Sequence, residues 1–161
     1  MREILFRGKA INRDKGYRRT EYKNGDWVYG LLTRPYDERF ESLPAEMTDT
    51  SGVSGIEVDY KSIGQYTGLK DKNGNKIFEG DIVRATIERS DGCQSPRTEN
   101  GVIGYDCIGM IGLILYKDKN GENVWSDFFN ELSMSGLIED CYFEVIGNIH
   151  DKKLEDFENG C

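Results

Sequence analysis

The sequence has little of what catalysis and metal binding most often use. Its 161 residues include one histidine, His150, with no serine or cysteine nucleophile motif nearby from which a catalytic triad could be built. The four cysteines, Cys93, Cys107, Cys141 and Cys161, are irregularly spaced and form no Cys-x-x-Cys pair, unlike the ligands of a zinc site. We therefore expect free thiols, with Cys107 and Cys141 in the core and Cys161 exposed, and no metal or other cofactor.

Long apolar runs are also missing. No stretch of eighteen apolar residues occurs, which argues against a membrane-spanning helix. The first residues lack the apolar stretch of a secretory signal, so the sequence predicts a cytoplasmic protein without a membrane partner. Apolar residues make up 37%, charged residues 31% and aromatic residues 11% of the chain, a polar composition that is still typical of a folded protein.

Glycine outnumbers proline by nineteen to three, which suits many tight turns better than long helices. Asn-Gly or Asp-Gly pairs, which favour hairpin turns, begin at residues 24, 73, 91, 100 and 120. The segment Lys-Asp-Lys-Asn-Gly occurs twice, at 70–74 and 117–121, in flanks that do not match. Short runs of β-branched and aromatic residues predict strands over residues 3–9, 26–33, 55–66, 81–88, 101–106, 110–117, 123–126 and 141–149.

These features predict a mainly β fold. From residue 79 onward, five short strands with a long first loop and a helical turn before the last strand are typical of a small SH3-like barrel. The predicted organisation is an additional N-terminal β lobe over residues 1–78 and an SH3-like barrel in the C-terminal half, residues 79–161. One continuous domain is the alternative.

Little helix is expected. The sequence predicts one or two short helices, at residues 127–134 and 151–157. The stretches 36–54 and 89–100 have little periodic apolar content and are predicted to be long loops, the first of them flexible.

One segment is specific enough to compare with a known family. Residues 63–83 read Ile-Gly-Gln-Tyr-Thr-Gly-Leu-Lys-Asp-Lys-Asn-Gly-Asn-Lys-Ile-Phe-Glu-Gly-Asp-Ile-Val, and they resemble the signature of the YopX proteins of bacteriophages and prophages. Phe6–Lys9, Asp26–Gly30 and Phe143–Ile149 are similar to further elements of that family. The resemblance implies a phage or prophage origin, hence a bacterial host cytoplasm, and a β fold with an SH3-type barrel. It implies no particular biochemical activity.

We interpret this signature as a folding element. Glycine permits turns and close backbone approach, and Asp or Asn side chains build turns by hydrogen-bonding their own backbone. The residues given this structural role are Gly64, Gly68, Asp71, Asn73, Gly74, Gly80 and Asp81. A calcium loop starting at Asp71 is disfavoured, because Lys76 and Ile82 stand where an EF-hand needs glycine and glutamate.

Close pairs of acidic residues are the remaining sequence feature that could indicate an enzyme. Glu57 and Asp59 point to one face of a predicted strand, and Glu79 and Asp81 flank a glycine. Paired carboxylates can serve acid–base chemistry, but among 29 acidic residues close pairs arise by chance. We interpret these pairs as solvated surface and predict no catalytic residue, so an enzyme with an acidic site ranks third among the hypotheses.

Charge is distributed unevenly along the chain, whose formal net charge is −8. Residues 1–23 contain eight basic and three acidic side chains, a charge of +5 that leaves −13 on the remainder. Tyrosines are interleaved with these cations, as on surfaces that bind single-stranded nucleic acid, but pairing with the chain's own acids is the favoured interpretation. The candidate interaction surface comprises Arg13, Lys15, Tyr17, Arg18, Arg19, Tyr22, Lys23, Trp27 and Trp125.

The leading hypothesis for function is a non-enzymatic phage accessory protein that associates with itself or with another phage or host protein. It is motivated by the charge asymmetry and by aromatic residues that are expected to be exposed, Trp27, Tyr29, Tyr36 and Trp125. The alternative is a nucleic-acid-binding module in phage replication or regulation.

Overall fold

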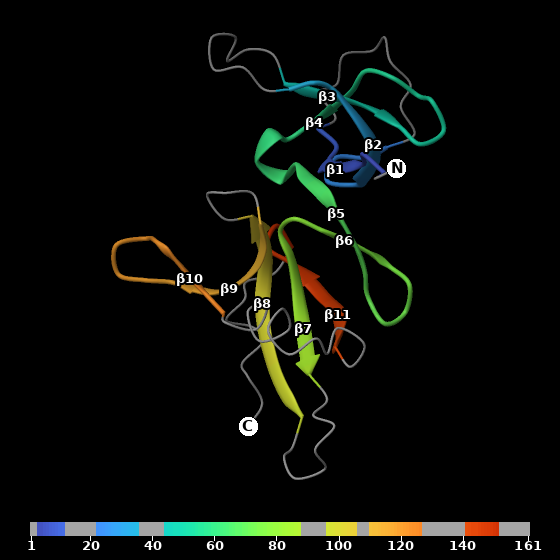
Figure 1. The fold of residues 1–161 in the computed structure, drawn as a ribbon. Helices are drawn as coiled ribbons and strands as arrows, with labels where there is room; N and C mark the ends of the chain where they lie inside the picture. Colours follow the sequence, from blue (N-terminus) through green and yellow to red (C-terminus); the bar gives the residue numbers. More distant parts are fainter. Residues whose placement is uncertain are drawn as a thin grey trace. The chain divides into compact units, whose positions relative to one another are not determined.

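The computed structural model describes residues 3–11, 22–35, 44–87, 96–105, 110–126 and 141–151. The architecture is mainly β, which confirms the predicted class: strands form two antiparallel sheets, and the one helical element in the described ranges is a single 3₁₀ turn (Figure 1). The chain divides into two compact units, Met1–Tyr66 and Thr67–Cys161. This division lies upstream of the boundary between residues 78 and 79 that the sequence predicts.

The first unit holds β1 (Phe6–Lys9), β2 (Trp27–Arg34), β3 (Ala45–Asp49), β4 (Ile56–Val58), the 3₁₀ turn η2 (Tyr60–Ser62) and the start of β5 (Gly64–Lys70). Strand β5 runs from the first unit into the second. The second unit continues with β6 (Lys76–Phe78), β7 (Asp81–Ile87), β8 (Arg97–Tyr105), β9 (Ile111–Lys117), β10 (Asn123–Trp125) and β11 (Cys141–Asn148).

In the first unit, antiparallel strands lie in the order β4-β3-β2-β1-β5. Successive residues of a strand point to opposite faces, and one face of this sheet carries an apolar core in which Val28, Met47 and Val58 have no exposed surface. Val58 also forms an isolated bridge with Ala10, just beyond β1. The bridge draws the ends of β1 and β4 together around the core.

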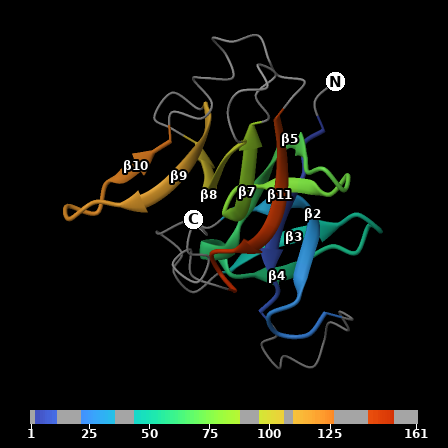
Figure 2. The same cartoon turned by 90° about the horizontal axis from the view of Figure 1, so that it is seen from below.

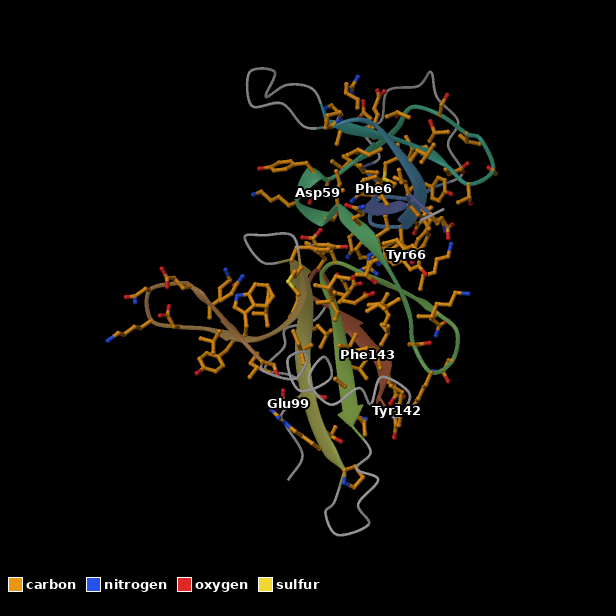
Figure 3. The ribbon with its side chains drawn as sticks, in the orientation of Figure 1. Phe6, Asp59, Tyr66, Glu99, Tyr142 and Phe143 are labelled. Atoms are coloured by element: carbon orange, nitrogen blue, oxygen red, sulfur yellow. The ribbon has the colours of Figure 1, made fainter. Side chains whose placement is uncertain are left out.

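In the second unit, the second half of β5 pairs with β6, and a separate five-stranded sheet has the order β10-β9-β8-β7-β11. Its core contains Val83, Ala85, Ile103 and Leu113, with Phe143 from β11 packed among them (Figure 3). Both strand orders are linear, so the strands of the described ranges leave each sheet open.

In the described ranges, three hairpins have the same turn geometry. They begin at Asp49, Asp71 and Asp118, and each carboxylate Oδ1 accepts backbone N–H groups two and four residues later, at 2.8–2.9 Å. The third residue after each aspartate is a glycine with φ between +82° and +94°, a conformation that glycine adopts at little cost. We call residues 71–75 the Asp71 turn and residues 118–122 the Asp118 turn. The duplicated Lys-Asp-Lys-Asn-Gly segment therefore forms the same turn twice.

Two stretches differ from the sequence-based expectation. Ala45–Asp49 forms β3 inside the stretch 36–54, so the prediction of a loop was wrong for these residues. Strand β8 begins at Arg97, inside the predicted loop 89–100. In both places most residues of the strand segment are polar, so apolar periodicity does not predict a strand there.

The predicted strand over residues 55–66 is divided between β4 and β5 by η2. The carboxylate of Asp59 accepts the backbone N–H of Lys61 at 3.1 Å and thereby caps this turn. The predicted helices at 127–134 and 151–157 lie outside the described residues apart from residue 151. No helical segment in the described part of the chain could cross a lipid bilayer.

Candidate interaction surface

Strand β2 presents apolar side chains to both faces of the sheet in the first unit. Val28 and Leu32 point into the core. On the opposite face Trp27 is half-buried, whereas Tyr29 is 41% and Leu31 is 52% exposed. Contiguous exposed apolar side chains mark interaction surfaces more often than scattered ones do. We call Trp27, Tyr29 and Leu31 the β2 face.

Two cations lie over the Trp27 ring. The guanidinium carbon of Arg7 is 4.7 Å and Nζ of Lys9 is 5.3 Å from the ring centroid. In the register of β1 on β2, Lys9 lies opposite Trp27 and Arg7 lies opposite Tyr29, so cross-strand neighbours supply both cations. Arg7 is only 6% exposed, and a cation–π contact is strongest when the cation is desolvated. These contacts hold Trp27 in place, and the half-buried Lys9 brings a positive charge beside the β2 face.

The predicted interaction surface is only partly within the described residues. Its members Arg13, Lys15, Tyr17, Arg18 and Arg19 lie outside them.

Tyr22 and Lys23, which follow that segment, are described. Tyr22 packs against the core, and its hydroxyl donates to Oδ2 of Asp49 at 3.0 Å, so this ring is an anchor and not an open stacking platform. Lys23 is exposed, and its backbone N–H donates to the Asp26 carboxylate at 2.7 Å.

Trp125 belongs to the second unit and is half-buried, although the sequence predicts an exposed side chain. Its ring lies against Gly112, where an added Cβ would be 2.5 Å from the indole. Gly112 pairs across the sheet with Gly104, which also faces the ring. The ring thus covers a pair of glycines and helps to cover the sheet. Tyr36, the other aromatic residue that the sequence predicts to be exposed, lies outside the described residues.

Asp71, the central residue of the signature, is buried and fully engaged in building its turn. Its carboxylate accepts the N–H groups of Asn73 and Asn75 and the side-chain amide of Asn75, the last at 3.0 Å. Burial by itself would raise the pKa of Asp71, but these donors and the backbone N–H of Val145 outweigh it and lower the pKa. A carboxylate held in the charged form by four donors is suited to shaping backbone.

The other signature residues also lie at turns or in strands. Gly68, Gly74 and Gly80 have positive φ angles, whereas Gly64 lies in β5 opposite Arg7. Asn73 contributes the first N–H that Asp71 accepts.

Asp81 is 1% exposed, and its Oδ2 accepts the N–H of Phe78 at 2.8 Å. Its other oxygen, Oδ1, accepts from the side-chain amide of Asn148 at 3.4 Å. The carboxylate thus links the start of β7 to the end of β11 inside the second unit.

The two members of each acid pair have different environments in the structure. Glu57 is half-buried in β4 opposite Glu46, and Asp59 caps η2. Glu79 is exposed, whereas Asp81, two residues later, is buried. Across the described ranges, no three acidic, histidine or cysteine side chains are grouped so that they could hold a metal ion.

Three residues of the candidate site are not predicted by the sequence. Leu31 sits in a strand that is apolar on both faces, and this pattern alone does not tell which face is the core. Arg7 and Lys9 lie two residues apart in β1, a spacing that places both on one face of a strand, but their meeting with Trp27 depends on the pairing register.

Comparison with known protein families places the chain. The model of the family described as YopX protein matches residues 14–154. The chain belongs to the YopX family. The match spans most of this YopX chain and confirms the resemblance in residues 63–83. The comparison with curated proteins found no match.

Proposed function

We propose that this YopX protein is a non-enzymatic accessory protein that self-associates, with the β2 face as its contact surface. The observation that carries the proposal is the exposure of Tyr29 and Leu31 beside Trp27 on one face of one strand. A second copy that covered this face would remove apolar side chains from water, and aromatic residues are enriched at the centres of interfaces.

Sedimentation velocity over a concentration series tests the β2 face. Leu31→Lys places a charge on the most exposed residue of the β2 face and should weaken association by roughly tenfold or more. Met110→Lys is the matched control, because Met110 is 62% exposed but lies in the second unit, before the start of β9. The proposal fails if the wild-type chain stays monomeric at the highest concentration, or if both variants associate as the wild type does.

Single-stranded nucleic acid is the second candidate ligand, and one observation favours it. The Lys9 ammonium lies 5.3 Å from the Trp27 centroid on the same face as Tyr29, and such sites combine cations with stacking rings. Fluorescence anisotropy with a labelled oligonucleotide at two salt concentrations tests this, with Lys9→Gln as the variant. The affinity should fall steeply with salt and with the loss of Lys9, and no binding at low salt rejects the idea.

For the second unit we further propose an SH3-like arrangement. Support comes from the strand order, in which β7 to β10 follow one another and β11 returns beside β7. The family implies a phage or prophage origin, and we infer a role in the cytoplasm of the bacterial host. Nuclear Overhauser contacts between residues of β10 and the end of β11 would support a barrel, and their absence would leave an open sheet.

A further inference from the structure

The Asp71 turn docks on the outer edge of β11, the last strand of its sheet (Figure 3). The backbone N–H of Lys72 donates to the Phe143 carbonyl at 2.8 Å, and the Asp71 carboxylate accepts the backbone N–H of Val145. The Lys72 ammonium lies 2.9 Å from Oε2 of Glu144. Two adjacent residues, an aspartate and a lysine, thus bind backbone and side chain of the same strand edge.

The Asp118 turn repeats this binding element. Its Asp118 N–H donates to the Glu122 carbonyl at 2.8 Å, and the N–H of Gly121 donates to the Asp118 carbonyl at 2.9 Å. The equivalent bonds of the Asp71 turn measure 2.8 Å and 2.9 Å. The two turns therefore have the same backbone form, and Asp118 and Lys119 stand where Asp71 and Lys72 stand.

The surroundings of the two turns differ. Strands β9 and β10 run outward from the other strands of their sheet, and the Asp118 turn lies at their tip (Figures 1 and 2). Asp118 is half-buried there, whereas Asp71 is only 6% exposed in its docked turn. The chain thus carries one docked and one projecting copy of the same element.

We propose that the Asp118 turn of one copy takes the place of the Asp71 turn on β11 of a second copy, with Lys119 paired to Glu144 of that second copy. The inference rests on the proposed self-association and supplies a second contact for it, separate from the β2 face. The resident turn is favoured because it is tethered to its site, so the exchange grows with protein concentration or when the resident turn is weakened. Reciprocal exchange gives a closed two-fold dimer.

Charge-reversal variants distinguish the effect of the docked turn on dimerisation from that of the projecting turn. Lys72→Glu removes the ion pair with Glu144 but leaves the backbone bonds of the turn, and it should raise the dimer association constant by roughly two- to fivefold. Adding Lys119→Glu to that variant should return the constant to the wild-type value or below. Lys61→Glu, an equal charge change on an exposed residue of the first unit, is the control and should not raise the dimer association constant.

A zero-length carbodiimide cross-link tests the geometry directly. Isotopically labelled and unlabelled full-length chains are mixed and cross-linked, and the peptides are read by mass spectrometry. A Lys119–Glu144 link that joins a labelled to an unlabelled peptide supports the exchange. Its absence in Lys72→Glu at concentrations where dimer is present overturns it, as does a Lys72→Glu variant that stays monomeric.

The same variants distinguish this inference from the β2-face proposal. If Leu31→Lys abolishes the dimer and Lys119→Glu does not, the β2 face is the contact and the turn exchange is wrong. If Lys119→Glu abolishes the dimer of Lys72→Glu and Leu31→Lys has no effect, the turn exchange stands and the β2-face proposal fails.

Discussion

The Trp125 indole lies directly against Gly112, so that a Cβ added at this glycine would be 2.5 Å from the ring atom Cε3. The cross-strand partner of Gly112 is Gly104, where an added Cβ would be 3.6 Å from the same ring. Two neighbouring glycines thereby make room on the sheet for one large side chain, which covers positions that have none of their own.

Gly112→Ala should displace the indole and destabilise the second unit by about 1–3 kcal/mol, the usual cost of overpacking a fitted site. Urea unfolding followed by Trp125 fluorescence, in a Trp27→Phe background, measures the change. Asn123→Ala, at an exposed position of the neighbouring strand β10, is the control and should leave the midpoint in place. An unchanged midpoint for Gly112→Ala would show that the ring can move aside without cost.

Gly30→Ala should be more damaging. A Cβ at Gly30 would be 1.9 Å from the carbonyl oxygen of Thr48, and backbone cannot rotate away as a side chain can. We expect a loss of more than about 3 kcal/mol in unfolding free energy, beyond the common range for overpacking. Gly8→Ala is the matched comparison, because its nearest neighbours are side-chain atoms of Val58 and Met47 at 3.2–3.3 Å. Circular dichroism during urea unfolding compares the two, and equal losses would contradict the argument.

The strand pattern of the second unit was largely predictable from the sequence, because alternation in segments such as 81–88 and 141–149 reflects one buried and one exposed face. The turns at Asp71 and Asp118 were also predictable from local sequence, because Asp and Asn side chains form hydrogen bonds with their own backbone. Strand β3 was not, because only two of its five residues, Ala45 and Met47, are apolar, and so short an alternation is a weak signal of a strand.

The candidate site shows the same division between local and long-range information. Trp27 and Tyr29 could be named from the sequence as aromatic residues in a strand. Their placement on the outer face, with the Arg7 and Lys9 cations over Trp27, depends on the register between β1 and β2. Register is a tertiary property that one sequence does not specify locally.

Tyr22→Phe tests the anchor between Tyr22 and the Asp49 turn. The hydroxyl donates to Oδ2 of Asp49 at 3.0 Å, and its removal should cost about 1 kcal/mol of stability. The pKa of Asp49 should also rise, because this hydroxyl is one of the donors that lower it. Carbon-detected NMR titration of the carboxyl measures the pKa. Tyr29→Phe, at an exposed ring, is the control and should leave the Asp49 titration unchanged.

Stability should depend on pH through Asp49 and Asp71. The Ser51 hydroxyl is the main cause that lowers the pKa of Asp49, and the Asn75 amide with backbone N–H groups lowers that of Asp71 against the effect of burial. Both folded pKa values lie below the ordinary value of 3.8 that applies to the unfolded chain. The unfolded state therefore binds these protons first as the pH falls, and the stabilisation present above 3.8 is lost progressively below it.

Urea midpoints measured between pH 7 and pH 3 test this, with Asp71→Asn as the variant. The asparagine keeps the shape of the side chain but accepts through one oxygen only, so we expect a loss of about 1–2 kcal/mol at pH 7. Its midpoint should then fall less steeply than that of the wild type below pH 4, because one of the two titrating groups is gone. Parallel curves for the two proteins across the acid range would mean that the charge of Asp71 does not stabilise the turn.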